Sequence, residues 1–335
     1  GGHRTVRSDS HSILPSQGCA CGNPGQRRQV ASMDAFDFII IGAGSAGCVL
    51  ANRISADPEN RVLLVEAGGS DNYLLVQMPT ALSYPMAMQR FNWGYESDPE
   101  PELNGRVINC PRGKGLGGTS SINGMVYVRG NPHDYEEWAA LGASGWGYRD
   151  CLPYFKRAET WIEGGDKYRG ADGPLGVCAG NEMRLNPLYR AFIDAGVQAG
   201  YPETTDYNGA QQEGFGPMHM TVRGGVREST TRAYLQPVKR RDNLTVITET
   251  LVQGIEFIDK RATGITVLRD GKTSKLRARR EVIVAAGAIA SPMLLQLSGL
   301  GSEHHLQSIG IALKHELPSI GENLQDHIEV YFQFH

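Results

Sequence analysis

The sequence predicts an α/β protein built on a Rossmann-like sheet, with a β-meander attached to it. An apolar, β-branched run at residues 36–41 leads into the glycine pattern G-x-G-x-x-G, as expected of a strand buried on both faces of a parallel sheet. A second apolar run, residues 61–65, ends at an acid. Residues 243–279 alternate apolar and polar side chains in short runs broken at turn residues, which indicates antiparallel strands.

Each glycine of the first pattern has a physical role in a dinucleotide site. Gly42 allows a sharp turn after the strand, Gly44 lets a pyrophosphate approach the main chain, and Gly47 lets the next helix pack on the strand. That helix is expected from Ser45 to about Ser55. Its unpaired N–H groups and the positive end of its dipole would then face the phosphates.

Glu66 stands at the carboxyl end of the second strand, where a carboxylate can accept hydrogen bonds from ribose hydroxyls. A 2′-phosphate would prefer an arginine at this place. A glycine-rich turn without a ligand is the competing interpretation, since 42 of the 335 residues are glycine. Strand, helix and acid occur together here, however, and together they predict an adenine dinucleotide, either NAD or FAD.

A second glycine-rich segment favours FAD. A nicotinamide enzyme typically continues with further βα units, whereas residues 67–130 contain few helix patterns and many turn formers. The segment "NCPRGKGLGGTSSINGMVYVRGN" forms a loop of glycine and hydroxyl residues. Such a loop can supply backbone N–H donors beside a pyrophosphate and a flavin ring without steric conflict.

This segment resembles the first signature of the glucose-methanol-choline (GMC) oxidoreductase family, and "GAIASPMLLQLSGLG" at residues 287–301 is similar to the second. The stretches "AGVQAGYPETTDYNGAQQEGFGPM" and "IGENLQDHIEVY" resemble the bacterial choline-oxidising members. The resemblance runs from about Phe36 to the end of the chain. It implies a Rossmann-like FAD/NAD(P)-binding fold with an incomplete α+β substrate domain.

The resemblance implies FAD as the cofactor. The glycines of the G-x-G-x-x-G pattern would hold its pyrophosphate, and the acid after the second strand would hold its ribose. The second glycine-rich loop would lie along the flavin, and the main chain of one further residue would contact the adenine. The residues so implied are Gly42, Gly44, Ser45, Gly47, Glu66, Gly117, Gly118, Asn123, Gly124, Met125 and Val252. Some relatives attach the flavin through a histidine in the "SSIN" segment. Ile122 occupies that place and cannot form such a bond, so noncovalent FAD is predicted.

The implied reaction is the FAD-dependent oxidation of a primary alcohol, most specifically of choline to betaine aldehyde. It requires removal of the hydroxyl proton and hydride transfer to flavin N5. Electrons would pass to a quinone or other respiratory acceptor rather than to NAD. The alternatives are a dehydrogenase for aliphatic or aromatic alcohols and an FAD-binding lyase on the same scaffold.

Recognition of choline requires a negative charge and aromatic faces, because a quaternary ammonium group accepts no hydrogen bond. Glu329 lies near Tyr331 and Phe332, and the resemblance implies that it faces the trimethylammonium group. The alternation of this segment could instead place Glu329 on a solvent face. The catalytic histidine and its His or Asn partner are expected beyond residue 335, and His327 resembles a structural position.

The second signature predicts a buried strand at Glu281–Ala286 and then a helix. Ser291 is expected to cap that helix, Pro292 to occupy its first position and Gly299 to end it. Small residues between strand and helix would let the chain turn beneath a cofactor. A second capped helix is expected from Ser229 in "STTRAYL".

The predicted domains are discontinuous. Residues 34–130 and 241–325 form the FAD-binding domain, and residues 131–240 and 326–335 form part of the substrate domain. Residues 1–33 are expected to be a disordered or non-native extension, with a transit segment as the alternative, because they are rich in arginine and serine and show no hydrophobic periodicity. The chain stops within an apolar alternating run, so we expect a fragment with little activity alone.

Charge and composition limit the partners. A net charge of −3 gives no basic face for nucleic acid, and six cysteines spread over residues 19–178 form neither a disulfide framework nor a zinc pattern. No run of 18 apolar residues occurs, which leaves peripheral membrane association open. The expected location is the bacterial cytoplasm or the cytoplasmic face of the membrane. A mitochondrial location is the less favoured alternative.

Overall fold

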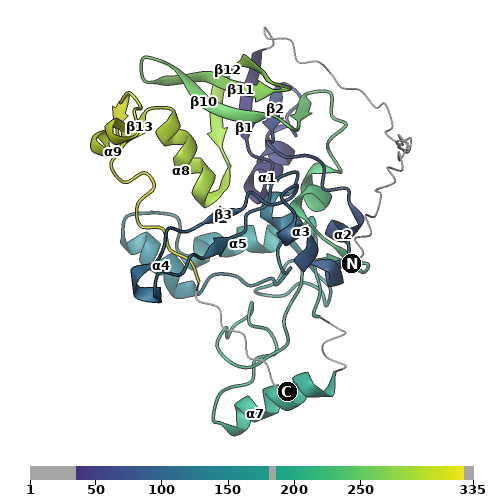
Figure 1. Ribbon diagram of the computed structural model, residues 1–335. Helices are drawn as coiled ribbons and strands as arrows, with labels where there is room; N and C mark the ends of the chain where they lie inside the picture. The colour runs from purple at the N-terminus through teal and green to yellow at the C-terminus, as the bar shows by residue number, and fades with distance from the viewer. Residues whose placement is uncertain (1–34, 181–185, 328–335) are drawn as a thin grey trace, which may run out of the picture. The chain divides into compact units, whose positions relative to one another are not determined.

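A six-stranded sheet in the order β10-β11-β12-β1-β2-β9 forms the centre of this computed structural model, which describes residues 35–180 and 186–327 (Figure 1). Four strands pair in parallel, namely β12 with β1, β1 with β2 and β2 with β9. The antiparallel strands β10 and β11 continue the sheet from β12. The strands are β1 (Ala35–Ile41), β2 (Val62–Val65), β9 (Leu244–Ile247), β10 (Leu251–Ile258), β11 (Arg261–Arg269) and β12 (Lys272–Val284). The predicted fold, a Rossmann-like sheet with an attached meander, is confirmed.

Strand β12 runs through both the antiparallel meander and the parallel part of the sheet. The sequence predicts two separate strands here. The first half of β12 pairs with β11 as far as Arg277, and from Arg277 to Val284 the strand pairs with β1. The predicted break before Glu281 is wrong, because a bulge and polar partners let the charged residues continue the strand. Arg279 lies 3.7 Å from Asp37, and the Arg280 guanidinium donates to the Asn60 side chain.

The edge of β12 that faces away from β1 is paired with β11 only in its first half. Beyond Arg277 no strand among residues 35–180 and 186–327 pairs with that edge. The side chains of Val282, Ile283 and Val284 are half-buried there. Parallel pairing with β1 therefore holds this half of the strand from one side only.

Helix α1 (Ser45–Ile54) packs on the sheet through its small residues and ends where predicted. The same core cluster includes Ala233, Tyr234 and Leu235 of η4, a single π-helical turn (Thr231–Leu235). The helix that the sequence predicted from Ser229 is limited to this short turn. Ser229 makes the predicted capping contact, because its hydroxyl accepts a hydrogen bond from the Arg232 N–H at 3.3 Å.

Helix α8 (Gly287–Leu297) starts five residues earlier than predicted. Ser291 does not cap it, and Pro292 lies inside it. The tight turn is made instead by Gly287 itself, at a φ of +88° that side chains rarely adopt. The predicted C-terminal end is confirmed, since Ser298 follows the helix and Gly299 has a φ of +88°.

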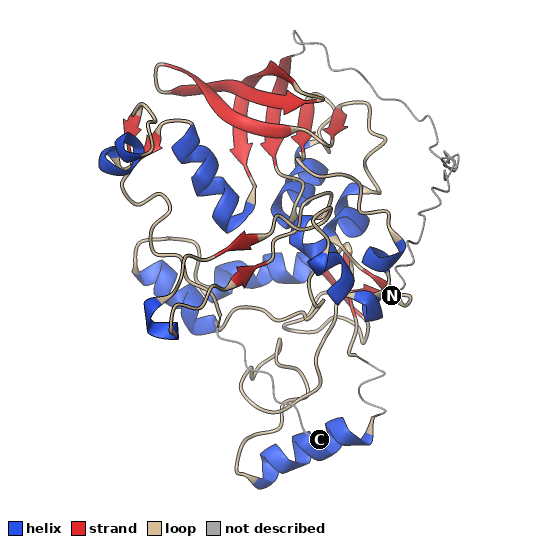
Figure 2. Cartoon of the chain, in the orientation of Figure 1, coloured by secondary structure: helices blue, strands red, loops and turns tan. Residues whose placement is uncertain are grey.

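Between β2 and β9 the chain folds mainly into short helices, loops and two-stranded sheets (Figure 2). The helices are α2 (Leu74–Gln77), α3 (Ser83–Ala87), α4 (Pro132–Ala140), α5 (Tyr148–Ala158) and α7 (Pro187–Gln198), with 3-10 turns η1 (Pro79–Ala81), η2 (Pro101–Leu103) and η3 (Gly118–Ser121). The strand pairs are β3 (Tyr95–Glu96) with β4 (Asn109–Cys110), β5 (Glu159–Trp161) with β6 (Leu175–Val177), and β7 (Val222–Arg223) with β8 (Val226–Arg227).

After α8 the chain forms β13 (Leu300–Gly301), α9 (Glu303–Ser308) and β14 (His315–Glu316), with β13 and β14 paired in parallel. Within the described ranges, no helix has both the length and the apolar character needed to cross a membrane.

Candidate cofactor site

The turn after β1 requires glycine on steric grounds. The Gly42 N–H donates to the Val65 carbonyl at 2.8 Å, and its φ is +96°. A Cβ at Gly42 would lie 2.7 Å from the Ala285 carbonyl oxygen, and one at Gly47 would lie 1.8 Å from the Gly42 carbonyl oxygen. Both predicted packing roles therefore follow from contacts within the protein.

Gly44 differs from these two glycines because its Cβ direction is open. The nearest atom to a Cβ built there is the Gly118 Cα, at 3.9 Å. The residues that follow, Ser45 and Ala46, are exposed, and α1 has no acid in its first turn. The first N–H groups of a helix have no acceptor within the helix, so this exposed end of α1 suits a phosphate.

The second glycine segment reaches the same place. The Gly117 N–H donates to the Ala43 carbonyl at 2.7 Å, and a Cβ at Gly118 would lie 2.7 Å from the Gly44 Cα. Gly117 also has a φ of +82°. The structure thus brings together the two glycine segments that are predicted to bind the pyrophosphate.

Glu66 ties these loops together. Its carboxylate accepts hydrogen bonds from the backbone N–H groups of Ala43 and Gly68, each at 2.8 Å, and of Gly115 at 3.0 Å. Burial raises the pKa of Glu66, and these N–H donors oppose the rise. A carboxylate accepts about four hydrogen bonds, so the backbone around Glu66 satisfies most of its acceptor capacity.

Three further glycines of the site were not singled out from the sequence. A Cβ at Gly68 would lie 2.4 Å from the Gly115 nitrogen, and a Cβ at Gly113 would lie 2.2 Å from the Gly118 carbonyl carbon. Gly115 has a φ of +138°. The high density of glycine in "RGKGLGG" could have indicated Gly113 and Gly115. The need for glycine at Gly68 comes from its contact with Gly115, which is distant in sequence and leaves no local pattern. We use the term cradle for the loops formed by residues 42–47, 66–69 and 113–125.

The sequence profile described as GMC oxidoreductase matches residues 36–329. The chain belongs to the GMC oxidoreductase family. Its similarity to an oxygen-dependent choline dehydrogenase of Vibrio vulnificus is 59% identity, covering 90% of this chain and 54% of that protein. An oxygen-dependent choline dehydrogenase of Chromohalobacter salexigens is 54% identical, with 89% and 54% covered. The chain spans about half the length of the curated relatives it matches.

Solved structures show the same GMC fold. A pyridoxine 4-oxidase from Mesorbium loti superposes with a TM-score of 0.83 at 34% identity, covering 87% of this chain and 57% of the other. An FAD-dependent oxidoreductase from Chaetomium thermophilum gives a TM-score of 0.81 at 32% identity, with 87% and 52% covered. The family and the FAD-dependent neighbour support FAD as the cofactor of this chain.

Hydroxyl side chains behind the GMC cradle converge on a buried acid. Asp71 accepts a hydrogen bond from the Ser229 hydroxyl at 3.1 Å and a longer one, 3.5 Å, from Ser121. The Thr230 N–H donates to the Ser120 hydroxyl at 3.0 Å. Burial raises the pKa of Asp71, and the hydroxyl donors lower it. These bonds join Asp71 and the 3-10 turn η3 to the residues immediately before η4.

The loop after η3 carries the predicted flavin-facing residues. Asn123 is half-buried, and its side-chain oxygen accepts from the Met125 N–H at 3.2 Å. Gly124 is exposed, with no atom within 4 Å of a Cβ built on it. Met125 is buried yet has a φ of +64°, which is costly for a residue with a side chain and is typical of binding sites.

The predicted adenine contact, Val252, lies away from these contacts. Val252 is half-buried in β10 and pairs with Val267 of β11, just after Thr250, whose N–H donates to the Glu66 carbonyl at 3.0 Å. The adenine role of Val252 stays a prediction. Glu329 lies outside the described residues.

The thiol nearest the cradle is inert. Cys48 is buried in α1 and donates to the Ala43 carbonyl at 3.2 Å. Burial raises its pKa to about 11, so the thiol stays protonated near neutral pH.

The second signature lines a cavity of about 430 Å³. One side is α8 and the other is the chain at residues 320–324. Of the small residues predicted to lie beneath the cofactor, Ala288 lines this cavity, whereas Gly287 and Ala290 do not. Its further lining includes Met293, Gln296 and Leu324.

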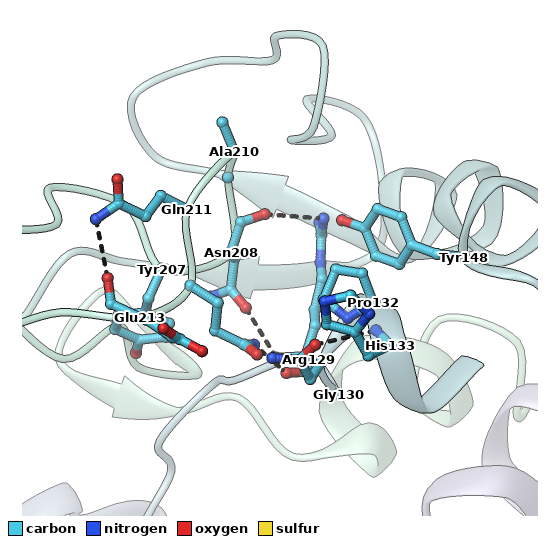
Figure 3. Close-up of a pocket in the computed structure, with 13 residues that line it drawn as sticks. Arg129, Gly130, Pro132, His133, Tyr148, Tyr207, Asn208, Ala210, Gln211 and Glu213 are labelled. Carbon is cyan, nitrogen blue, oxygen red and sulfur yellow. Dashed lines mark hydrogen bonds between the residues drawn. The ribbon is translucent and has the colours of Figure 1, made fainter. Parts of the chain in front are cut away.

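A smaller pocket of about 220 Å³ lies elsewhere, between the start of α4 and residues 207–213 (Figure 3). Arg129 and Asn208 hold one wall together, since the Arg129 N–H donates to the Asn208 side chain at 2.8 Å. Tyr148 and His133 also line it. None of the residues predicted to bind the cofactor lines this pocket, so it is distinct from the cradle.

Proposed function

We propose that the whole protein is an FAD-dependent alcohol dehydrogenase that oxidises choline to betaine aldehyde. The observation that carries the proposal is the cradle, in which two glycine segments and one buried acid meet around an exposed helix start. The names of the relatives at 54–59% identity supply choline as the alcohol.

The cradle residues fit FAD on three structural grounds. The open Cβ direction of Gly44 and the exposed start of α1 leave room and donors for a pyrophosphate. The carboxylate of Glu66 lies where the cradle loops meet, which is the place proposed for the ribose. The exposed Gly124 and the strained backbone of Met125 offer main chain to the flavin. When bound, FAD supplies the hydride acceptor.

Noncovalent attachment is part of the proposal. The Ile122 side chain is buried in a cluster with Val76 and Phe91. It is apolar and carries no group that could bond to the flavin. We expect denaturation with acid to release the flavin into the supernatant.

We assign recognition of the trimethylammonium group to Glu329, on the resemblance to choline-oxidising relatives. The base that removes the hydroxyl proton is proposed to be a histidine in the part of the relatives' length that this chain does not span. The chain's own contribution is then to bind and orient the cofactor.

Two electron acceptors compete in the proposed reaction. The family resemblance implies a quinone or other respiratory acceptor, whereas the choline dehydrogenases that match are named oxygen-dependent. Oxygen is therefore the acceptor to test first, with a soluble quinone as the comparison. Another alcohol is the alternative substrate, favoured by the pyridoxine 4-oxidase structure at 34% identity.

The deciding experiment uses the full-length protein in its complete reading frame. It should purify yellow, and choline should bleach the flavin absorbance without oxygen more efficiently than pyridoxine or an aryl alcohol. A colourless protein that cannot be reconstituted with FAD would falsify the proposal. Conversion of an alcohol-containing substrate without bleaching would instead identify the lyase alternative.

A further inference from the structure

A buried arginine, Arg227, holds the cradle loop at Ser120 and Asn123. Arg227, the last residue of β8, has no exposed surface. Its Nε donates to the Val76 carbonyl at 2.8 Å, and its Nη1 donates to the Asn123 carbonyl at 2.7 Å and to the Asn123 side-chain oxygen at 2.9 Å. Every one of these acceptors is neutral.

Arg227 has no acid beside it. Within residues 35–180 and 186–327, no carboxylate lies within 4.0 Å of its guanidinium nitrogens, and its Nη2 is buried without a hydrogen-bond partner. Burial lowers its pKa to about 10, with no opposing acid. The side chain nevertheless stays charged at neutral pH.

A buried charge without a counter-charge is costly and is normally paired or relieved by a ligand. Besides Val76 and Ser120, Arg227 contacts Asn123, whose side chain in turn accepts from the N–H of Met125. Asn123 and Met125 belong to the loop that is predicted to line the flavin. FAD carries negative charge on its pyrophosphate, and two-electron reduction adds negative charge to the flavin.

We propose that Arg227 is a positioning residue of the cradle and the fixed positive charge that complements bound FAD. Its hydrogen bonds hold Asn123 and thereby the strained turn at Met125. Its unpaired charge favours the bound cofactor, and favours the reduced form over the oxidised form. This inference rests on the proposed function, because it takes FAD as the ligand of the cradle.

The test uses full-length protein and two measurements, the Kd of the apoprotein for FAD and the midpoint potential of the bound flavin. Arg227→Met keeps the length of the side chain and removes its charge and donors. We expect the Kd to rise about 10- to 100-fold, as for the loss of charged hydrogen bonds. A tenfold smaller preference for reduced FAD corresponds to a midpoint potential lower by about 30 mV.

Two further variants separate charge from shape. Arg227→Lys keeps the charge but cannot bridge Val76 and Asn123 in the arginine geometry, so we expect weaker FAD binding with a retained potential. Arg223→Met is the matched control, because Arg223 is a half-exposed arginine of the neighbouring strand β7 that pairs with Glu228. It should leave both quantities unchanged.

A folded Arg227→Met protein with the wild-type Kd and potential overturns the inference. If that variant does not fold, Arg227→Lys decides: an unchanged Kd overturns the inference, and a raised Kd with the wild-type potential supports it. Failure of the wild-type protein to bind FAD counts against the proposed function instead, so the two failures are distinguishable.

Discussion

Two buried arginine sites in this protein differ in whether a carboxylate compensates the arginine charge. Arg129 and Arg169 share the buried carboxylate of Glu159, at 2.6 Å and 2.9 Å, and Arg169 also binds Asp206 at 2.9 Å. Arg227 is as deeply buried but contacts only neutral oxygens. We call the first group of four residues the paired network.

The difference is what we expect between a structural site and the proposed binding site. In the paired network two positive charges meet two negative ones, so no charge is left for a ligand. At the cradle loop a positive charge remains beside Asn123, two residues from the strained backbone of Met125. Changes in the paired network should therefore cost stability, whereas changes in the cradle should cost cofactor affinity.

The largest expected effect is that of Glu159→Gln in the paired network. This change leaves Arg129 and Arg169 without a shared counter-charge in a buried site, which costs about 3–5 kcal/mol. Thermal unfolding of the full-length protein measures it as a clear loss of Tm. The FAD affinity of the folded fraction should stay at the wild-type level.

The matched control for Glu159 is Glu203→Gln, which breaks an arginine–carboxylate pair with Arg190 on the surface. Its Tm should match that of the wild type, because exposed ion pairs are screened by solvent. Equal losses of Tm in Glu159→Gln and Glu203→Gln would contradict the difference proposed between the buried and exposed ion pairs.

The next effect is that of Gly47→Ala in the cradle. The new Cβ would meet the Gly42 carbonyl oxygen at 1.8 Å, so the helix start and the turn must separate. Overpacking of this kind costs about 1–3 kcal/mol, and here it also displaces the phosphate-binding N–H groups. Flavin content after purification should fall to near zero. Gly124→Ala is the control for stability, since nothing lies within 4 Å of its Cβ position.

Glu66→Gln should affect affinity more than stability. A glutamine oxygen can replace only one carboxylate oxygen, so at least one N–H among those of Ala43, Gly68 and Gly115 loses its acceptor, at a cost of about 1–3 kcal/mol. Titration of the apoprotein with FAD should show weaker binding, while Glu249→Gln, at an exposed neighbour, should bind normally. Wild-type affinity in the Glu66 variant would remove this acid from the site.

The smallest expected effect is a change in pH dependence at Asp71. Burial raises its pKa above the ordinary 3.8, so the folded protein binds the proton more tightly than the unfolded chain does. Stability therefore falls as the pH rises through the window between the two values. In Asp71→Asn that fall should be absent, and in Asp242→Asn, at an exposed site, it should persist. Tm measured from pH 4 to pH 8 provides the test, and identical profiles for the wild type and Asp71→Asn would contradict it.

Local patterns in the sequence predicted the parts of the fold that depend on neighbours along the chain. The strand ending at Ile41, the helix from Ser45 and the acid at Glu66 each have a short-range signature, and all three were placed correctly. The helix end at Gly299 was found for the same reason. The likeness to a family extended these predictions to the second glycine loop.

What the sequence did not reveal depends on contacts between distant segments. The continuous strand β12 needs Asp37 and Asn60 as partners for its arginines. The role of Glu66 as a tie between three loops needs Gly115 beside it, and Arg227 needs Asn123. A single arginine in "VREST" carries no local mark of burial, so neither period nor composition could single it out.

The outer edge of β12 beyond Arg277 has a practical consequence for handling the protein. Its peptide groups form a ready template for a further strand, and extended segments of other molecules compete for such templates. Preparations of residues 35–327 alone should therefore self-associate as their concentration increases. A short peptide with alternating valine and threonine, or a charged substitution at Ile283, would be the first remedies to try during purification.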